Sequence, residues 1–239
     1  MVVSLTLSKL DFQYFSILSF KGYIFDDLIL TKEQIAQNSL SDDDYDHSHY
    51  GGLTDTDFRW KNGVIPYRLS MKFNSTRKAK IKRIIHELNE IFVGCIHFRE
   101  YIYSKDEDYV LLTLPHPPKR LGICRSSLGR TGKMQKIVLS SNCQTHDIMH
   151  ELLHCIGLLH EHSRPDRDEH VEVLIDNVKN DRKQNFEIFP NQWSYNEPYN
   201  LRSIMHYNKN AHRRAPGILT MKPKVPKFFY LYFKVVIYL

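Results

Sequence analysis

The most constraining feature of the sequence is the stretch HELLHCIGLLHEH, residues 150–162, which holds four of the 13 histidines in a chain of 239 residues. On an α-helix His150 and His154 project from the same face, about 40° apart around the axis. Two neutral imidazoles one turn apart suit two corners of a tetrahedral zinc site. Glu151 follows the first ligand, so it points away from the metal but stays beside a water molecule bound there, where a general base is needed.

The third histidine needs a break in the helix before it can join the first two. His160 lies six residues after His154, so on a continuing helix it would sit about 240° further round and face away. Gly157 lies between them, and glycine readily adopts the conformation that ends a helix and redirects the chain. The spacing H-E-x-x-H-x-x-G-x-x-H therefore predicts three histidine ligands around one zinc ion.

An alternative interpretation treats the same stretch as an amphipathic core helix that happens to contain histidines. Its apolar residues are compatible with that interpretation: Leu152, Leu153, Ile156 and Leu158. The His, Glu and Gly frequencies of this chain make a chance occurrence of the full spacing rare, roughly one in ten thousand, so the metal interpretation is favoured. His162, the fourth histidine of the run, is left out of the zinc site, and His146 is expected to be exposed or to cap the helix.

A second motif agrees with the first. Ser-Ile-Met-His-Tyr, residues 203–207, follows the third histidine by 43 residues, and extended histidine motifs of this kind are paired with a methionine turn. Together with Glu161 and the run RPDRD at 164–168, these residues resemble the astacin family of zinc endopeptidases. The resemblance implies that Met205 lies under the site without binding zinc. It also implies that Tyr207 supplies a phenol that can bind the resting zinc and then stabilise the oxyanion.

The resemblance also implies the fold. We expect an α+β, metzincin-type zinc protease of two subdomains: an N-terminal twisted sheet with two long helices, and a C-terminal subdomain that is mostly irregular and apparently truncated. The residues support the first subdomain, since apolar side chains recur at helical spacing after Asn74 and β-rich runs follow at 95–98, 109–114 and 136–140. A substrate is expected to lie extended along a sheet edge above the metal. The residues leave open which strand forms that edge.

Three segments are expected along the chain: a prosegment at 1–50, an astacin-like catalytic domain at 51–222 and an atypical apolar tail at 223–239. Prosegments of the family carry an aspartate that fills the open position of the zinc. By this resemblance Asp27, in the stretch FDDLILTKEQ at 25–34, is the zymogen latch. A carboxylate there displaces the water that would act as the nucleophile. The alternative is an ordinary solvated acidic turn.

The resemblance places the activation cleavage in a polar, acidic segment. Residues 41–52, SDDDYDHSHYGG, suit a cleavable linker, and the mature N-terminus is expected near Gly51. In the family the new amine becomes buried against the glutamate after the third zinc histidine, here Glu161. No Lys or Arg occurs between Lys32 and Arg59. An activating protease that cuts there is therefore expected to be non-tryptic.

The chain has four cysteines and no C-x-x-C pair, so the sequence indicates neither a zinc ribbon nor a redox motif. The family resemblance pairs Cys124 with Cys143, which presumes an oxidising, extracytoplasmic setting. Cys155 lies about 100° round the helix from His154 and is expected to face the core. Whether Cys155 pairs with Cys95 or both stay reduced is left open.

Charge is distributed unevenly along the chain. The whole chain carries +6, and residues 1–50, with three lysines and eight acidic residues, carry −5, so the remainder carries +11. A basic domain could bind nucleic acid, but no recognition motif supports this, and we expect no nucleic-acid partner. Attraction to acidic peptides, or to the chain's own N-terminal segment, is the simpler explanation.

Secretion is expected from the resemblance and the disulfide, although the first twenty residues make a poor signal peptide. Asn74-Ser75-Thr76 is an N-glycosylation sequon in a secreted chain and also fits a helix cap, and the two roles are compatible. The apolar run at 227–239 is too short to span a membrane as a helix.

The sequence therefore predicts a secreted endopeptidase, made as a zymogen, that binds one Zn²⁺ per chain and hydrolyses protein or peptide substrates. Glu151 is expected to remove the proton from the attacking water and pass it to the leaving nitrogen. The alternative is a truncated, inactive relative that binds zinc or peptide without cleaving it.

Overall fold

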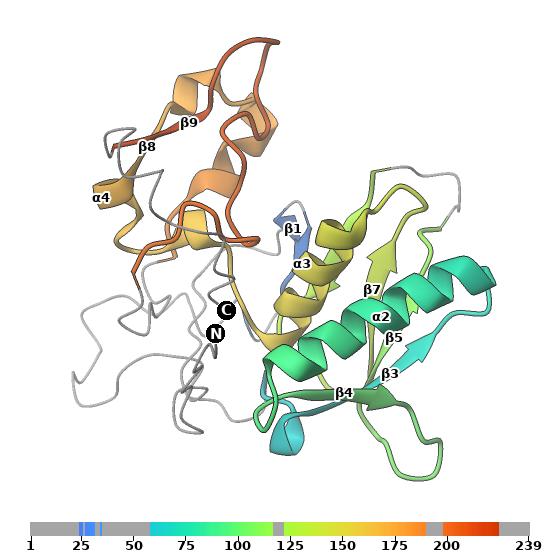
Figure 1. The fold of residues 1–239 in the computed structure, drawn as a ribbon. Helices are drawn as coiled ribbons and strands as arrows, with labels where there is room; N and C mark the ends of the chain where they lie inside the picture. The colour runs from blue at the N-terminus through green and yellow to red at the C-terminus, as the bar shows by residue number, and fades with distance from the viewer. Residues whose placement is uncertain are drawn as a thin grey trace, which may run out of the picture.

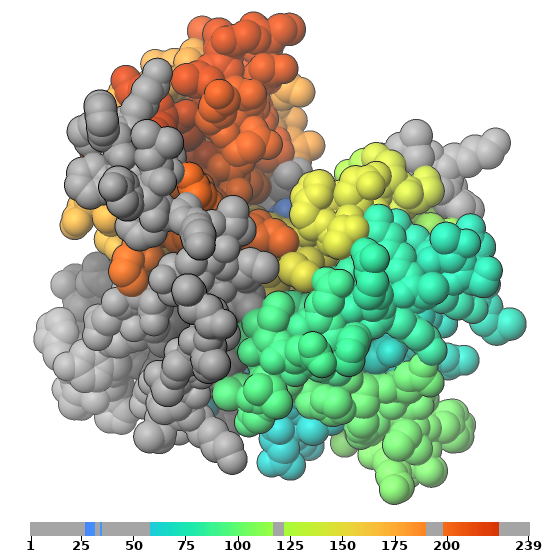
Figure 2. Space-filling view, in the orientation of Figure 1, coloured from blue at the N-terminus to red at the C-terminus, as the bar shows by residue number. Residues whose placement is uncertain are grey.

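The computed structural model describes residues 24–25, 27–31, 34, 58–116, 122–189 and 198–224. Within them the chain forms two lobes (Figure 1). The first holds a mixed sheet with two helices, and the second is built from short helical turns and a two-stranded sheet. The space-filling view shows a hollow between the lobes, and the blue N-terminal segment is visible inside it (Figure 2).

The sheet of the first lobe has seven strands in the order β1-β2-β6-β7-β5-β3-β4. Their bounds are β1 Ile24–Phe25, β2 Leu28–Ile29, β3 Val64–Leu69, β4 His97–Glu100, β5 Tyr109–Thr113, β6 Cys124–Ser127 and β7 Met134–Leu139. β3 is parallel to β4 and β5, and β5 is parallel to β7, whereas β6 runs antiparallel to β7. The short β2 is parallel to β6, so the N-terminal segment extends the sheet beyond β6.

Two long helices, α2 Ser75–Ile91 and α3 Thr145–Ile156, lie on one face of this sheet (Figure 1). α2 begins after Asn74, whose side-chain oxygen accepts a hydrogen bond from the Arg77 amide at 2.8 Å, as an N-cap does. Its buried residues recur three and four apart and join the same core as the strands: Ile81, Ile84, Ile85 and Leu88. The short 3-10 turn η4, Lys61–Gly63, precedes β3. The α+β fold is confirmed.

The predicted strands are present with shifted ends. The runs predicted at 109–114 and 136–140 correspond to β5 and β7. The run predicted at 95–98 begins too early, because residues after α2 form a turn in which the Cys95 amide donates to the Phe92 carbonyl at 2.9 Å. β4 therefore starts at His97. The sequence does not predict β6, because Cys-Arg-Ser-Ser lacks the apolar alternation of a strand.

The second lobe follows Gly157 and contains little regular structure in its described residues. Its bounds are η5 Glu161–Ser163, α4 Arg167–His170, β8 Val171–Val173, η6 Ile175–Asn177, η7 Asn180–Phe186 and β9 Met221–Pro223. β8 and β9 pair antiparallel, and a small apolar cluster is buried beside them: Val178, Phe186 and Met221. The expectation of a mostly irregular C-terminal subdomain is confirmed.

The disulfide predicted from the resemblance is present. Cys124 at the start of β6 is bonded to Cys143, just before α3, so β6 is tied to the start of the histidine-bearing helix. Cys95 and Cys155 are free thiols. Cys155 is fully buried in the core, as its helical position predicts, and burial raises the pKa of its thiol. Among the described residues, no helix has the length and apolar character needed to cross a bilayer.

Candidate metal centre

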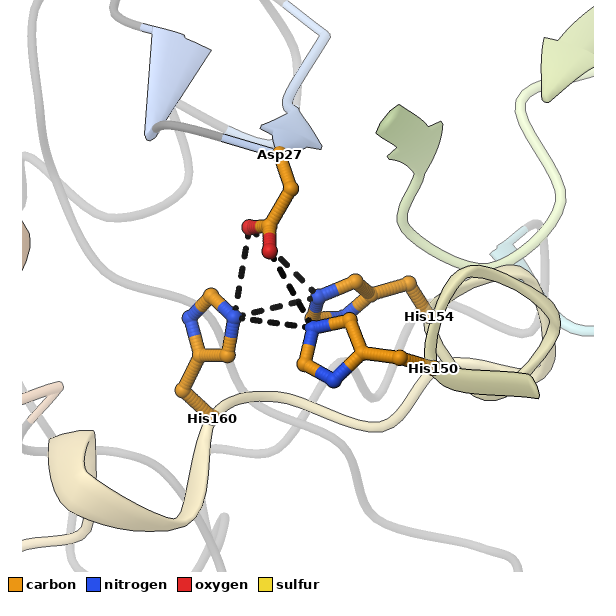
Figure 3. Close-up of side chains that lie close together, drawn as sticks. All are labelled: Asp27, His150, His154 and His160. Atoms are coloured by element: carbon orange, nitrogen blue, oxygen red, sulfur yellow. Dashed lines mark hydrogen bonds and ion pairs between the residues drawn. The ribbon is translucent and has the colours of Figure 1, made fainter. Parts of the chain in front are cut away.

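α3 presents the first two histidines of the motif on one side. The helix begins after Gln144, whose amide donates to the Asp147 carboxylate at 2.6 Å. Ile148 and Leu152, one turn apart, are fully buried in the core and orient the helix on the sheet. His150 and His154 consequently project together from α3 toward His160 and Asp27 (Figure 3).

α3 ends where the sequence predicts. Gly157 has φ +124°, and its amide donates to the carbonyls of His154 at 2.9 Å and Leu153 at 3.2 Å. This backbone conformation is one that residues with a Cβ rarely adopt, so glycine permits the reversal. The chain then returns and places His160, which is 2% exposed, opposite the two helical histidines.

The three imidazoles converge on one point (Figure 3). Nε2 of His160 lies 3.2 Å from Nε2 of His150 and 3.2 Å from Nε2 of His154. With Zn–N bonds of about 2.0–2.1 Å, two corners of a tetrahedral site lie about 3.3 Å apart. The spacing of the donors therefore fits zinc.

The proton positions on the two helical histidines support the same conclusion. Nδ1 of His150 donates to the Ile204 carbonyl at 2.8 Å, and Nδ1 of His154 donates to the Leu158 carbonyl at 2.7 Å. In the neutral ring each Nδ1 therefore carries the proton, and each Nε2 presents a lone pair to the centre. Burial, together with the neighbouring imidazoles, holds the pKa of His154 well below its usual value, so this ring is neutral, as a metal ligand must be.

Asp27 completes the cluster from the N-terminal segment (Figure 3). Its carboxylate oxygens lie 3.2 Å from Nε2 of His150, 3.2 Å from Nε2 of His160 and 3.8 Å from Nε2 of His154. The four ligand atoms all lie within 4.8 Å of one another. Burial alone would raise the pKa of Asp27, but the histidines around it hold that pKa well below its usual value. An ordinary solvated turn does not match this environment.

The segment that carries Asp27 is hydrogen-bonded along β6. The Ser126 amide donates to the Asp27 carbonyl at 2.8 Å, and the Leu128 amide donates to the Ile29 carbonyl at 3.3 Å. The Gln34 side chain adds a further bond, from Nε2 to the Leu128 carbonyl at 2.9 Å. β6 is thus the sheet edge beside the metal centre, which the sequence left undetermined, and the N-terminal segment covers it.

The methionine turn supports the centre through its backbone. The Ile204 carbonyl orients His150, and the Met205 carbonyl accepts a hydrogen bond from the Glu161 amide at 2.9 Å. Met205 is buried in the main core, and Glu151 is buried on α3 between the two helical histidines. The sequence does not predict that the carbonyls of Ile204 and Leu158 orient the histidines, because every residue has a carbonyl and no side chain distinguishes these two.

Tyr207 and His162 lie side by side next to the cluster. The Tyr207 ring centroid is 5.0 Å from that of His160 and 3.9 Å from that of His162. His162 is fully buried, and its Nε2 donates to the Asn185 carbonyl at 3.0 Å. It therefore lies outside the group of metal-ligating atoms. His146 also lies outside it, with a side chain 72% exposed and 2.9 Å from the Asp147 carboxylate.

Glu161 faces away from the metal into a polar network of the second lobe. Its carboxylate accepts hydrogen bonds from Arg164 at 3.0 Å and from the Asn200 amide at 2.8 Å. Burial raises the pKa of Glu161, and these bonds offset part of that effect. Arg164 in turn binds Asp166 through two nitrogens, at 2.9 and 2.7 Å. Gly51, the expected partner of Glu161 after cleavage, lies outside the described residues.

Comparisons with known proteins agree with this geometry. The family model described as Astacin, a family of peptidases, matches residues 52–231. Zinc metalloproteinase nas-4 of Caenorhabditis elegans is 37% identical over 169 residues, which cover 70% of this chain and 51% of that protein. The dorsal-ventral patterning protein tolloid of Drosophila melanogaster is 35% identical over 168 residues, covering 69% of this chain and 15% of tolloid. The chain thus spans about half the length of the first relative and much less of the second.

A solved structure is also similar. High choriolytic enzyme 1, a hatching enzyme zinc-protease from the medaka fish Oryzias latipes, superimposes with a TM-score of 0.62 at 30% sequence identity. The match covers 70% of this chain and 80% of that enzyme. The two-lobed fold therefore has a counterpart of known structure.

Proposed function

This chain belongs to the astacin family of zinc peptidases, and from this premise we propose that it is an endopeptidase that hydrolyses peptide bonds within proteins. The observation that carries the proposal is the convergence of three Nε2 atoms, 3.2 Å apart in two of the pairs, around one point. The donor set suits one Zn²⁺ per chain, held by His150, His154 and His160.

Bound zinc supplies Lewis-acid activation of a water molecule. The other steps belong to the chain's own residues. Glu151, which directly follows the first ligand and is 2% exposed, takes the proton of the attacking water and delivers it to the leaving nitrogen. Tyr207 donates a hydrogen bond from its phenol to the developing oxyanion. Met205 and Gly157 support these groups structurally.

The substrate is expected to bind along β6. The Ser126 and Leu128 amides donate to carbonyls of the N-terminal segment in this structure, and the same donors become available once that segment leaves. An extended peptide would use them to add a strand to the sheet, which places its backbone next to the metal. The disulfide between Cys124 and Cys143 keeps this edge in register with α3.

The N-terminal segment makes the chain a zymogen in this proposal. Asp27 fills the open side of the histidine cluster, and β2 covers the edge on which substrate would bind. Both the nucleophile's place and the substrate's place are therefore taken by one segment. Removal of residues 1–50 by a non-tryptic activating protease would free both, and the new amine near Gly51 would then reach Glu161.

Secretion is part of the proposal, supported by the disulfide and by the family. Asn74 is proposed as a glycosylation site of the secreted protein. Asn74, Ser75 and Thr76 are all exposed, and the helix cap uses only the side-chain oxygen of Asn74. The amide nitrogen that would carry the sugar is not needed for the cap, so both roles can coexist.

The test compares the full chain with Asp27→Ala and with a matched control, Asp176→Ala, which removes an exposed carboxylate far along the chain in the second lobe. Casein digestion is measured with and without a zinc chelator, alongside metal analysis. We expect one zinc per chain in all three proteins, and Asp27→Ala to digest casein roughly tenfold faster or more, because it removes the latched population.

The outcomes separate the parts of the proposal. Equal digestion by all three proteins would remove Asp27 from its role and leave the peptidase assignment intact. Full zinc binding without digestion by any of them, or by the chain from which residues 1–50 have been removed, would instead support the alternative, a relative that binds zinc without cleavage.

A further inference from the structure

The fourth histidine of the motif has no part in the metal cluster, yet it is firmly held beside it. His162 is fully buried, and its Nε2 donates to the Asn185 carbonyl. Its own carbonyl accepts a hydrogen bond from Arg167 at 3.1 Å, and the same Arg167 nitrogen donates to the Phe186 carbonyl at 2.7 Å. Both the ring and the backbone of His162 are therefore fixed to the second lobe.

The face of the His162 ring packs against the ring of Tyr207. The rings of His162 and Tyr207 are stacked, with centroids 3.9 Å apart and planes at 24°. Other rings around Tyr207 lie further away and at steeper angles: His160 at 5.0 Å and 50°, His212 at 5.3 Å and 64°, and Phe186 at 5.7 Å and 71°. Tyr207 is thus stacked on His162 and enclosed by these other rings.

The stack forms while a carboxylate fills the open side of the cluster. Asp27 brings negative oxygens to within 3.2 Å of two ligand nitrogens. An oxyanion that develops on a substrate would bring the same charge to the same side. In this structure Tyr207 is therefore stacked on His162 while that side is occupied by negative oxygen.

We propose that His162 is a positioning residue for Tyr207, and that its ring face holds the phenol where it can serve an oxyanion at the metal centre. The inference rests on the catalytic role proposed above for Tyr207. Stacking removes freedom from the phenol before the reaction begins, and such preorganisation of a hydrogen-bond donor contributes to the rate rather than to substrate binding. The fourth histidine thus acts on the site through another side chain.

The test uses the full chain with Asp27→Ala, loaded with zinc, as the background. His162→Gln keeps an N–H for the Asn185 carbonyl but has no ring, and His162→Phe keeps the ring face but has no donor. Tyr207→Phe and the double variant His162→Gln/Tyr207→Phe complete a cycle. For each protein kcat and KM for a fluorogenic peptide, the zinc content and Tm are measured.

The expected pattern separates positioning from structure. His162→Gln lowers kcat by roughly tenfold, the size that an aromatic pair of this kind supports, and leaves KM within about twofold. His162→Phe recovers most of the lost kcat. In the double variant the glutamine adds little to the effect of Tyr207→Phe, because the two changes act on one group.

A second readout does not depend on activity. In the zinc-free full chain with Asp27 intact, the ring protons of Tyr207, assigned by comparison with Tyr207→Phe, are expected to shift in the NMR spectrum of His162→Gln and to stay near their original position in His162→Phe. If the glutamine variant does not fold, His162→Leu replaces it, since leucine fills the space without a ring.

Several results would overturn the inference. Additive losses in the double variant, or equal losses of kcat in the glutamine and phenylalanine variants, would show that the ring face does not act through the phenol. A slow Tyr207→Phe beside a fully active His162→Gln would reject the inference and leave the proposed role of Tyr207 standing. Full kcat in Tyr207→Phe would reject that role, and the inference with it.

Discussion

The lobes before and after Gly157 are stabilised in different ways. The first is a sheet with two long helices around a continuous apolar core, so its backbone groups are paired within regular elements. The second has one four-residue α-helix and a pair of three-residue strands in its described part. Its backbone groups are paired mostly in turns and loops, and side chains contribute as well. Arg167 alone donates to two buried carbonyls, those of His162 and Phe186.

The metal centre depends on both kinds of structure. Two of the three proposed ligands come from α3 of the first lobe and the third from the second lobe, and the Ile204 carbonyl from the second lobe orients His150 in the first. The regular lobe holds the proposed general base, Glu151, in a helix, whereas the irregular lobe can bring in groups from distant parts of the chain. Substitutions in the first lobe, in the second lobe and at the junction between them should therefore affect different properties: kcat, zinc affinity or the free energy of unfolding. The sizes of these effects should differ as well.

The largest effect is expected in α3 of the regular lobe. With Asp27→Ala as the background, Glu151→Gln should lower kcat by about 10³-fold, because it removes the general base and keeps the shape of the side chain. Zinc content should not change, since Glu151 is not a ligand. Glu90→Gln, an exposed change on α2, serves as the control. Activity retained by the Glu151 variant would remove that residue from its role.

The next effect is expected at the junction. Gly157→Val should weaken zinc binding by about 10²-fold, measured by chelator competition, because valine is strained at φ +124° and His160 would be displaced. Gly94→Ala is the matched control: Gly94 also has positive φ, has open space around its Cβ position and lies far along the chain from the ligands. If both variants bind zinc equally well, the chain reversal does not determine the third ligand.

A smaller effect should distinguish the two lobes in stability. Arg167→Met should lower the free energy of unfolding by about 2–3 kcal/mol, because it leaves two buried carbonyls without a donor. Lys82→Met in the first lobe removes an ion pair with Glu100 whose partners are 53% and 67% exposed. This variant should change the free energy of unfolding by less than about 1 kcal/mol. Urea unfolding of both variants gives the comparison, and equal values would contradict it.

The smallest effect concerns the start of α2. Asn74→Ala removes both the cap and the sequon, and should lower the free energy of unfolding by about 1 kcal/mol in unglycosylated protein. Asn74→Asp keeps a capping oxygen and removes only the sequon, so its stability should stay close to that of the parent. Glycosylation is checked by expressing the proteins through a secretory pathway and measuring their mass before and after deglycosylation. The parent should lose mass on deglycosylation, and neither variant should.

The sequence by itself determined the local features of this protein. The spacing of histidines on one helical face, the glycine that ends that helix and the apolar periodicity of α2 all act over a few residues, so they can be seen in the order of the residues. The α+β fold, the disulfide partners and the proposed set of three histidine ligands followed from such patterns and from a family resemblance that rests on them.

Only the tertiary structure decided the rest. β6 became the covered edge through backbone pairing with β2, and His150 received its tautomer from a carbonyl 54 residues away. The stack of His162 on Tyr207 likewise joins two segments of the second lobe whose separation in sequence carries no signal. Backbone groups are chemically the same at every position, and ring faces meet only after folding. No pattern of side chains along the chain can therefore predict these contacts.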